Sequence, residues 1–362
     1  MKIALVYDHV NKIGGAERIL VALHELFPDA PLFTLVYAPY PATWAQNIRV
    51  IPSFMQRLPL AKRFHELYPG IGLFAFERFS FTDYDVVISV CAKEAKGIIT
   101  GPHTLHICYC LTPTRYLWSH YADYFKPGIM RRLSLPFVSL LRCWDTIAAQ
   151  RPDHYLAISN TVAQRIAKFY RREAQVIYPP VELDKFKIKE DPKPGDYFLI
   201  VSRLVGYKHL EVAIEACSQL KLPLKIIGSG LERANLEKKA GPTVEFLGNL
   251  TEVEVIEYYQ NCRALLFPQE EDFGITAVEA LASGKPVICY RGGGALEIIT
   301  PGVTGEFFWP QTSTALKLVL QKFAPTQYNS GLCRKAAERF SSRHFAKQFL
   351  GFIKKTIGGS QN

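Results

Sequence analysis

Short apolar runs alternate along the whole chain with longer stretches in which apolar residues recur every three to four positions. The longer stretches, such as AERILVALHELF and HLEVAIEACSQL, have the helical period. The short runs predict buried strands, at residues 2–7, 85–90, 106–110, 154–158, 197–202, 224–227, 244–247, 264–267 and 287–290. This alternation predicts α/β domains with parallel sheets, and continuously apolar strands indicate sheets that are covered on both faces.

The length of the chain predicts more than one domain. It has 362 residues, more than a single hydrophobic core usually serves. A polar stretch at residues 187–196, KIKEDPKPGD, is typical of an interdomain linker. We therefore predict a first domain at 1–186, a second at 187–345, and a C-terminal helix at 346–362 that packs back on the first domain. Two such domains should form a cleft, with ligands bound outside the carboxyl ends of the strands.

Composition restricts the class of protein. Hydrophobic residues make up 48% and charged residues 21%, as in globular proteins. There is no apolar run of about 18 residues, so we expect no transmembrane helix, and MKIALVYDHV lacks the features of a signal peptide. The eight cysteines include no C-x-x-C pair and most lie in apolar surroundings. We expect reduced core thiols in a cytoplasmic protein, rather than disulfides or a zinc site.

The net charge of +10 is spread over both halves of the chain. A basic balance leaves three kinds of partner open: nucleic acid, an anionic membrane surface, and small substrates that carry phosphate. The chain has no compact basic tract and no nucleic-acid motif, so we do not expect nucleic acid.

Two groups of residues that follow predicted strands suit an anion. Gly14 and Gly15 precede a predicted helix, where glycine lets backbone approach a ligand closely and free N–H groups attract negative charge. Arg203 and Lys208 lie on either side of Gly206, and both can converge on one diphosphate. Taken singly, the glycine pair is more typical of a structural turn, and the basic pair is equally compatible with a solvated loop.

Two further groups follow later strands. Glu271 precedes a predicted helix, and Glu279 lies inside it, within the apolar stretch ITAVEALA. A buried carboxylate is costly unless it is hydrogen-bonded, so Glu279 needs a structural partner or a ligand with vicinal hydroxyls. Three glycines at 292–294 indicate close backbone approach to a ligand. The four groups together, all after strands, indicate one ligand site.

At this point the chain resembles the retaining nucleotide-sugar glycosyltransferases of the GT-B fold, in the family called glycosyltransferase family 4. The resemblance rests on EEDFGITAVEALASGKPVI, which contains Glu271 and Glu279, and on VSRLVGYKHLEVAIEA, which contains Arg203 and Lys208. GGGALEII and GVTGEFF also fit. FPQEEDFGITAVEA and YCLTPTRYLW are similar to bacterial mannosyltransferases of O-antigen and exopolysaccharide assembly. The resemblance implies two Rossmann-like domains whose parallel sheets face each other across a cleft.

The resemblance also implies roles for residues. Arg203 and Lys208 hold the donor diphosphate and stabilise the charge on it as it leaves, and Glu271 meets the transferred sugar. Glu279 accepts hydrogen bonds from the ribose hydroxyls. The remaining donor-binding residues implied are Gly14, Gly15, Ser202, Gly228, Asn249, Leu250, Phe273, Gly274, Ile275, Thr276, Gly293 and Gly294.

The implied chemistry needs neither a metal nor a cofactor other than the nucleotide-sugar co-substrate, which we expect to be GDP-mannose. Fixed cationic side chains replace a divalent metal, and no D-x-D motif stands at a suitable strand end. In the family, the leaving diphosphate is thought to help deprotonate the acceptor hydroxyl on the same face, so that configuration is retained. Glu271 and Glu279 are therefore not expected to form an acid–base pair.

One position departs from the family. Many relatives carry a histidine that contacts the donor sugar where this chain has Leu111, and leucine cannot donate, accept or titrate. Three explanations stay open: the backbone does the work and Leu111 shapes the pocket near C6 of the sugar; the donor is a different sugar, such as a 6-deoxy sugar; or activity is weak or lost. His120 is not expected to substitute directly.

The acceptor side is predicted to include Leu111 and Arg115. Residues 53–81 and 124–144 interleave basic and aromatic side chains, which suits a lipid headgroup boundary as well as a helical core with a solvated basic edge. The first reading predicts a lipid-diphosphate-linked saccharide acceptor at the inner membrane face. Other functions left open are transfer from UDP-hexose or another nucleotide sugar, sugar-nucleotide epimerisation, and a weakly active scaffold of a polysaccharide-assembly complex.

Overall fold

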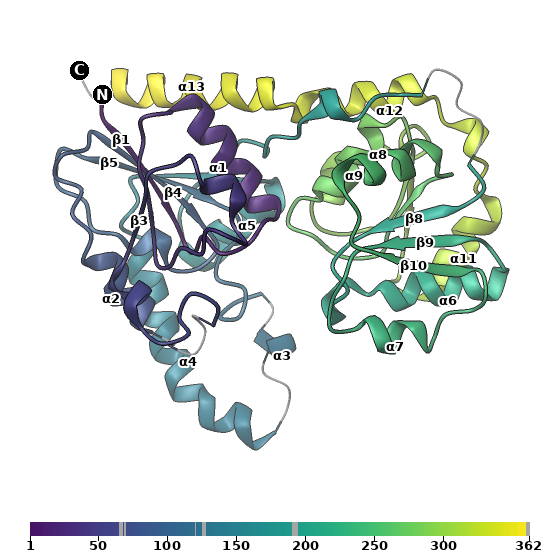
Figure 1. The fold of residues 1–362 in the computed structure, drawn as a ribbon, viewed down its shortest axis with the longest axis horizontal. Coiled ribbons are helices and arrows are strands. Elements are labelled where there is room, and N and C mark those ends of the chain that lie inside the picture. Colours follow the sequence, from purple (N-terminus) through teal and green to yellow (C-terminus); the bar gives the residue numbers. More distant parts are fainter. Residues whose placement is uncertain (65–67, 69, 120, 125–127, 190–194, 360–362) are drawn as a thin grey trace. The chain divides into compact units, whose positions relative to one another are not determined.

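A computed structural model places the chain in two compact units (Figure 1). The first unit comprises Met1–Pro179 and Gln348–Asn362, and the second comprises Pro180–Lys347. The structure describes residues 1–64, 68, 70–119, 121–124, 128–189 and 195–359.

The first unit is built on a seven-stranded parallel sheet in the order β3-β2-β1-β4-β5-β6-β7. Its strands are β1 (Ile3–Tyr7), β2 (Leu32–Thr34), β3 (Val50–Pro52), β4 (Val86–Cys91), β5 (Leu105–Cys110), β6 (His154–Ala157) and β7 (Gln175–Val176). Its helices are α1 (Gly15–Leu26), α2 (Ile71–Glu77), α3 (Tyr121–Tyr124), α4 (Ile129–Ala148) and α5 (Asn160–Tyr170), with 3₁₀ turns η1 (Thr43–Ala45), η2 (Phe54–Arg57) and η4 (Ala95–Gly97). Strands β1 and β4 are buried along their whole length, as their apolar sequences require.

The second unit has a six-stranded parallel sheet in the order β10-β9-β8-β11-β12-β13. Its strands are β8 (Phe198–Val201), β9 (Leu224–Ile227), β10 (Val244–Gly248), β11 (Leu265–Phe267), β12 (Val287–Tyr290) and β13 (Gly305–Phe308). Figure 1 shows α6, α7 and α11 on one face of this sheet and α8, α9 and α12 on the other.

The helices of the second unit connect these strands. Their bounds are α6 (Leu210–Leu220), α7 (Arg233–Glu237), α8 (Glu252–Asn261), α9 (Ile275–Ala282), α10 (Ala295–Ile298), α11 (Ser313–Lys322) and α12 (Ser330–Ala337), with 3₁₀ turns η5 (Leu183–Lys185), η6 (Gly206–Lys208), η7 (Pro325–Gln327) and η8 (Glu338–Phe340). Helix α13 (Ser342–Gly359) begins in the second unit and ends in the first. In the first unit its Phe349 ring lies 6.1 Å from that of Tyr109, and Phe352 lies 5.7 Å from His154, centroid to centroid.

All nine predicted strands are present, and none differs from its predicted bounds by more than one residue at either end. Four strands are additional: β2, β3, β7 and β13. They have two to four residues each, and three of them are edge strands. Runs this short do not stand out from loops by apolar pattern alone.

The chain passes between the units at Pro179 and Pro180, earlier than the predicted boundary at 186/187. The reason is that the intervening residues pack on the second unit. The Val181 N–H donates to the Phe340 carbonyl over 2.9 Å, and the Arg334 guanidinium donates to the Leu183 carbonyl over 2.7 Å. The predicted linker, 187–196, therefore lies within the second unit, and its residues 190–194 fall outside the described residues.

Each sheet contains one place where the chain reverses its direction of travel across the sheet, between β1 and β4 and between β8 and β11. Loops that leave the carboxyl ends of two such strands turn away from each other, and this is where α/β sheets bind ligands. The predicted residues near positions 14, 203 and 271 follow β1, β8 and β11.

Candidate functional site

The loops after β8 and β11 bring together two of the predicted catalytic residues. Lys208 ends the 3₁₀ turn η6 after β8, and Glu271 lies in the loop after β11. The Lys208 ammonium donates to the Glu271 carboxylate, and both side chains are mostly buried. The Lys208 Nζ also lies 5.1 Å from the centre of the Tyr207 ring. The pair spans the place where the order of the second sheet reverses.

The glycine turn after β12 packs directly on the Glu271 loop. The Gly294 N–H donates to the Glu271 carbonyl over 2.8 Å. A Cβ on Gly293 would lie 2.2 Å from that carbonyl oxygen, and Gly293 has a left-handed φ of +61°. A Cβ on Gly294 would lie 2.3 Å from the Phe273 carbonyl oxygen. Glycine is therefore required here so that two strand-end loops can lie against each other.

The loops after β8, β9 and β10 also lie together. The Ser202 N–H donates to the Ile227 carbonyl over 3.0 Å, and the Gly228 N–H donates to the Gly248 carbonyl over 2.8 Å. Gly228 has a φ of +130°, and an added Cβ would lie 2.0 Å from the Ser202 carbonyl oxygen. Asn249 follows directly and is exposed, and Leu250 is half-buried. These four predicted donor residues thus belong to one edge of the sheet.

Arg203 lies on the same edge but makes a different contact. Its guanidinium donates to the Tyr207 hydroxyl over 2.6 Å, and its side chain is exposed. The predicted cations therefore differ in state: Arg203 is held by a phenol at the surface, whereas Lys208 is buried against a carboxylate.

Helix α9 begins directly after the Glu271 loop. Gly274 precedes the helix with a φ of +113°, and Phe273 is buried with its ring 5.3 Å from that of Phe340. Ile275 and Thr276 form the first turn and are half-buried. The N–H groups of a first helical turn have no partner inside the helix, so this turn suits an acceptor group such as a sugar hydroxyl or a phosphate oxygen.

Glu279 has a structural partner inside the fold. Its side chain is only 3% exposed, and the buried Tyr259 hydroxyl of α8 donates to its Oε2 over 2.9 Å. One of the two readings left open by the sequence, a structural partner for this carboxylate, is therefore present. The ribose role stays a prediction.

In the first unit, Gly14 and Gly15 stand at the start of α1 beside an acidic side chain. The Tyr7 hydroxyl donates to Glu17 Oε1 over 2.7 Å, and Glu17 is buried. A Cβ on Gly14 would lie 3.0 Å from Glu17 Oε2. A carboxylate already occupies the first turn of the helix, so a phosphate there would meet like charge. The phosphate role of Gly14 and Gly15 stays a prediction, and the negative charge of Glu17 argues against it.

Leu111 continues the ladder between β4 and β5. Its N–H donates to the Cys91 carbonyl over 2.8 Å, and its side chain is half-buried. Arg115 is also half-buried, and Thr112 and Thr114 are buried. The backbone of Leu111 is thus fixed by the sheet whatever its side chain. His120 lies outside the described residues.

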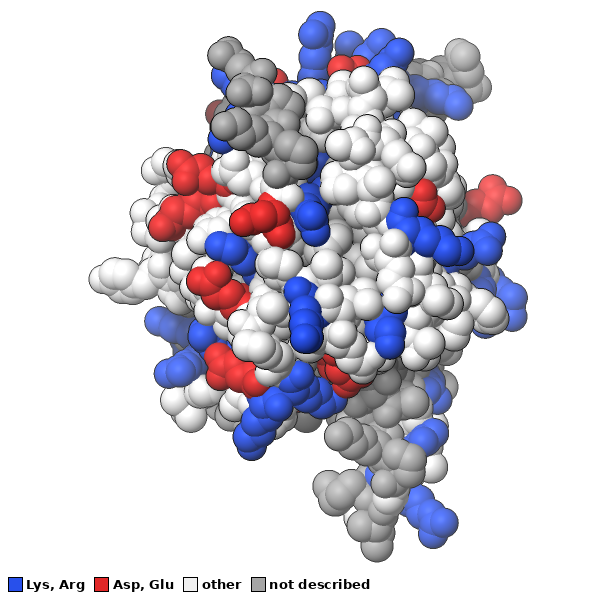
Figure 2. All heavy atoms as spheres, turned by 90° about the vertical axis from the view of Figure 1, so that its right-hand side faces the viewer, with Lys and Arg blue, Asp and Glu red and all other residues white. Residues whose placement is uncertain are grey.

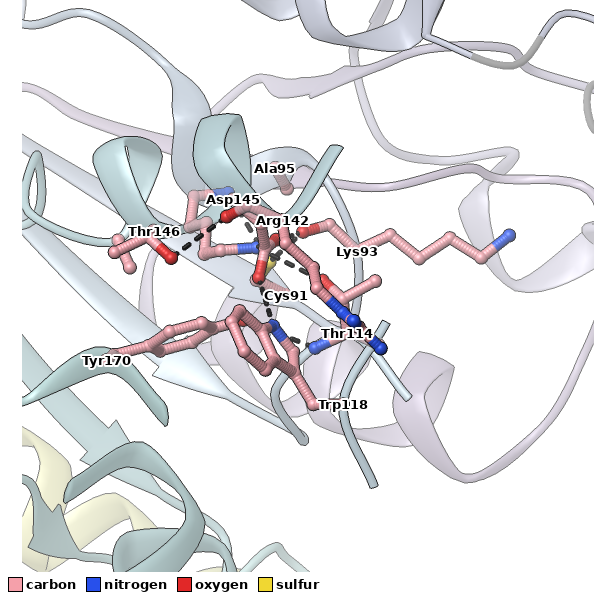
Figure 3. Close-up of polar contacts among 12 residues, drawn as sticks. Cys91, Lys93, Ala95, Thr114, Trp118, Arg142, Asp145, Thr146 and Tyr170 are labelled. Atoms are coloured by element: carbon pink, nitrogen blue, oxygen red, sulfur yellow. Dashed lines mark hydrogen bonds and ion pairs between the residues drawn. The ribbon is translucent and has the colours of Figure 1, made fainter. Parts of the chain in front are cut away.

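A buried polar network in the first unit was not predicted from the sequence (Figure 3). The Lys96 ammonium donates to Asp145 Oδ1 over 2.6 Å, and both side chains are buried. Thr114 donates to the same oxygen over 2.8 Å, and the Trp118 indole donates to Oδ2 over 2.7 Å. Burial acts to lower the pKa of Lys96, but Asp145, together with Tyr170, Cys91 and Tyr155, outweighs burial, and the pKa is raised. The network holds the segment after β5 against α4.

One feature of the sequence could have indicated this network. Asp145 is the only acidic residue of α4, and it lies on the side that carries the buried Val138 and Leu141. Its partner Lys96, however, is 49 residues away, and no spacing rule connects them.

The face shown in Figure 2 has no large patch of a single charge sign, because basic and acidic side chains are interspersed on it. A nucleic-acid surface is expected to show a stripe of one sign. Within the described residues, no helix is long and apolar enough to cross a membrane.

Residues 181–340 match the family described as Glycosyl transferases group 1. Among characterised relatives, the chain is 23% identical to O-antigen chain mannosyltransferase C of Escherichia coli, over 97% of each chain. It is 26% identical to the D-rhamnosyltransferase WbpZ of Pseudomonas aeruginosa over 56% of each, and 30% identical to a GDP-mannose-dependent alpha-mannosyltransferase of Mycolicibacterium smegmatis over 45% of this chain and 46% of that one.

The fold is that of solved glycosyltransferases such as WaaG, which superposes with a TM-score of 0.62 over 95% of each chain, at 19% identity. HepE of Anabaena in complex with UDP superposes with a TM-score of 0.73 over 98% of this chain and 100% of that one, at 18% identity. The two parallel α/β units form the GT-B fold, as predicted.

Proposed function

We propose that this chain, whose residues 181–340 match the group 1 glycosyl transferases, is a retaining hexosyltransferase that moves mannose from GDP-mannose to a saccharide acceptor in bacterial polysaccharide or lipopolysaccharide assembly. The observation that carries this proposal is the Lys208–Glu271 pair, with Arg203 on the same sheet edge, at the reversal between β8 and β11. Cations and a carboxylate at this place suit a diphosphate next to a sugar.

The proposed chemistry is one displacement on one face of the sugar. An acceptor hydroxyl oxygen bonds to the anomeric carbon, and the bond from that carbon to the donor phosphate oxygen breaks. The phosphate leaves with the electron pair and takes up the hydroxyl proton. Arg203 and Lys208 stabilise the growing negative charge, so we propose that no metal is needed. Glu271, released from Lys208, accepts hydrogen bonds from hydroxyls of the transferred sugar.

The donor is the least constrained part of the proposal. The E. coli and Mycolicibacterium relatives are mannosyltransferases, which supports GDP-mannose. The Pseudomonas relative is a D-rhamnosyltransferase, and rhamnose is a 6-deoxy sugar that would suit an apolar neighbour such as Leu111. The Anabaena structure holds UDP, so a UDP-sugar is the second alternative.

A panel of donors tests the activity. The protein is incubated with GDP-mannose, GDP-rhamnose, UDP-glucose and UDP-N-acetylglucosamine, each with and without native membrane lipid extract or octyl α-D-mannoside, and nucleotide release is followed. We expect release from GDP-mannose that acceptor accelerates. Without turnover of any donor, with or without acceptor, the enzyme proposal is wrong and the scaffold alternative stands.

The same panel run on Leu111→His addresses the donor sugar. The backbone at 111 is fixed by the ladder to Cys91, so the substitution changes the side chain and not the path of the chain. A shift of donor preference toward a 6-hydroxylated sugar supports a pocket shaped by Leu111 for a 6-deoxy donor. An unchanged preference supports a role that the backbone performs.

We also propose that the acceptor is lipid-linked and that the first unit docks on the inner membrane face. Leu73 of α2 packs against Val138 and Leu141 of α4, so the two basic–aromatic stretches share one part of the unit. On another side of α4, Leu133, Phe137 and Leu140 are 69%, 43% and 66% exposed. Large apolar side chains at this spacing form one stripe of the helix.

Basic side chains lie beside exposed aromatic or apolar residues in both stretches. Arg78 lies over the ring of the exposed Phe54 at 5.5 Å, Arg63 lies over Phe64 at 5.1 Å, and Arg132 beside Leu133 is exposed. Exposed apolar residues next to cations suit anionic headgroups. Residues 65–67, 69 and 125–127 of the two stretches, with Lys126 among them, lie outside the described residues.

A further inference from the structure

Glu94 is a titratable residue of the first unit for which neither the fold nor the proposed mechanism gives a role. It follows β4 at the place where the order of the first sheet reverses, between β1 and β4. This is the position at which an α/β sheet binds ligands. The side chain is half-buried and does not cap the 3₁₀ turn η4 that it precedes.

The loop that carries Glu94 is held rigidly by Asp8, at the end of β1. The Asp8 carboxylate accepts three backbone hydrogen bonds, from the N–H groups of Ala92, Lys93 and Ala95, over 2.8, 2.9 and 2.8 Å. Asp8 is buried, and these three hydrogen bonds stabilise its negative charge. The sheet therefore fixes the backbone on both sides of Glu94, whose own carboxylate is not needed for that purpose.

The Glu94 carboxylate faces two elements besides its own loop. A Cβ added to Gly72 of α2 would lie 3.8 Å from Glu94 Cδ and 3.1 Å from Leu35 Cδ1, so the Glu94 side chain lies beside α2 at a position that Leu35 also borders. Tyr116, in the segment after β5, is half-buried and packs on the same apolar cluster as Leu73, the neighbour of Gly72. After burial, the Glu94 carboxylate is the largest cause that raises the pKa of Tyr116. Its phenol is therefore neutral. Among the described residues, none forms a hydrogen bond or ion pair with the Glu94 carboxylate.

We propose that Glu94 and Tyr116 bind a hydroxyl-bearing ring of the saccharide acceptor, with the Glu94 carboxylate accepting hydrogen bonds from its hydroxyls. The inference rests on the proposed glycosyl transfer and names the acceptor site of the first unit. The Glu94 carboxylate offers acceptors and the Tyr116 hydroxyl offers a donor, and the fixed loop presents the carboxylate without reorganisation.

The site should respond to pH. Burial and then Asp8 raise the pKa of Glu94 to about 7, while Lys93 and Lys96 lower it and Asp145 raises it. Tyr116 stays neutral throughout this range. Above about pH 7 the carboxylate accepts two or more hydrogen bonds, and below it the protonated group is a weaker acceptor. Acceptor affinity should therefore fall as pH falls through about 7.

The test is a comparison of half-saturating concentrations in the transfer assay, with octyl α-D-mannoside and native lipid extract as acceptors. For Glu94→Gln we expect the half-saturating concentration of the acceptor to rise about tenfold and that of the nucleotide sugar to stay unchanged. We also expect the half-saturating concentration of the acceptor to lose its dependence on pH. Glu94→Asp should keep that pH dependence, and Tyr116→Phe should raise the acceptor value. Glu25→Gln, an exposed glutamate of the same unit, is the matched control.

The outcomes separate this inference from the proposed function. If wild type transfers sugar and Glu94→Gln keeps the acceptor value and its pH profile, the role of Glu94 is wrong and the transferase stands. If Glu94→Gln raises the values for donor and acceptor alike, with a lowered melting temperature, Glu94 has a structural role and the inference is again overturned. If wild type transfers to no acceptor, the proposed function fails and the inference fails with it.

Discussion

At the scale of single residues, Glu279 and Lys208 show two ways in which a buried charge is kept in the second unit. Glu279 lies in an apolar helix and takes a hydrogen bond from Tyr259, whereas Lys208 and Glu271 neutralise each other. A carboxylate or ammonium in such places is stable only with these partners. Binding of a diphosphate to Lys208 would replace the Glu271 carboxylate with another anion, so the Lys208 ammonium keeps a counter-charge before and after binding.

Glu279→Ala separates its structural bond from its predicted ribose contact. Loss of the bond leaves the Tyr259 hydroxyl buried without its acceptor, and we expect the free energy of unfolding to fall by about 1–3 kcal/mol. Two lost ribose bonds should also weaken GDP binding by at least about tenfold, measured by calorimetry. Tyr259→Phe is the control, because it removes the same internal bond and should leave GDP affinity within about twofold. Unchanged GDP affinity in Glu279→Ala would refute the ribose role.

At the scale of elements, Asp145 fixes α4 to the 3₁₀ turn η4 and to the segment after β5, and another side of α4 is exposed. Asp145 on its buried side receives Lys96, Thr114 and Trp118 (Figure 3). Arg142 adds a bond from Nε to the Leu117 carbonyl over 2.8 Å. The segment 112–118, which contains the predicted acceptor-side residue Arg115, is therefore positioned by the bonds of its Thr114 and Trp118 to α4.

Asp145→Asn tests this anchor. The substitution leaves Lys96 buried without a counter-charge, so we expect a loss of about 3–5 kcal/mol in the free energy of unfolding, read from denaturant midpoints. Replacing both residues, as Lys96→Met with Asp145→Asn, should cost less than the sum of the single changes. Glu237→Gln, which breaks an exposed pair with Arg233, should cost less than about 1 kcal/mol. Equal effects in Asp145→Asn and Glu237→Gln would show that the buried pair is no anchor.

At the scale of the whole molecule, the two units are similar in construction and differ in what their loops carry. The second unit collects Ser202, Arg203, Lys208, Gly228 and Glu271 along one edge of its sheet. The first unit has Glu94 and the Leu111 segment at its own strand ends, and α4 presents apolar side chains to solvent. This division fits a donor site in one unit and an acceptor and lipid surface in the other.

Vesicle co-sedimentation tests the lipid surface. We expect wild type to bind vesicles of phosphatidylglycerol and phosphatidylcholine, to bind pure phosphatidylcholine weakly, and to lose binding as salt is raised. The triple variant Leu133→Ser, Phe137→Ser, Leu140→Ser should lose most of the binding, because the apolar stripe is gone. The control Leu231→Ser, Leu318→Ser removes two exposed leucines of the second unit and should bind as wild type. Equal binding of both variants would exclude α4 as the docking surface.

From the sequence alone we predicted the α/β class, the nine strands and the strand-end residues that lie along one edge of the second sheet. This was possible because apolar period and strand-end glycines are local properties of the chain. We placed the unit boundary too late, since the contacts of Val181 and Leu183 with Phe340 and Arg334 join residues far apart in the chain.

Only the tertiary structure decided which strand ends are neighbours and which charges meet. Lys208 and Glu271 are 63 residues apart, and Lys96 and Asp145 are 49 apart. The two pairings follow from the order of strands in the sheets and from the packing of α4. Neither the strand order nor the helix packing can be predicted from a short stretch of sequence. The same holds for Glu94: its position at the reversal of the first sheet, over Gly72 and beside Tyr116, exists only once β1, β4, β5 and α2 have come together.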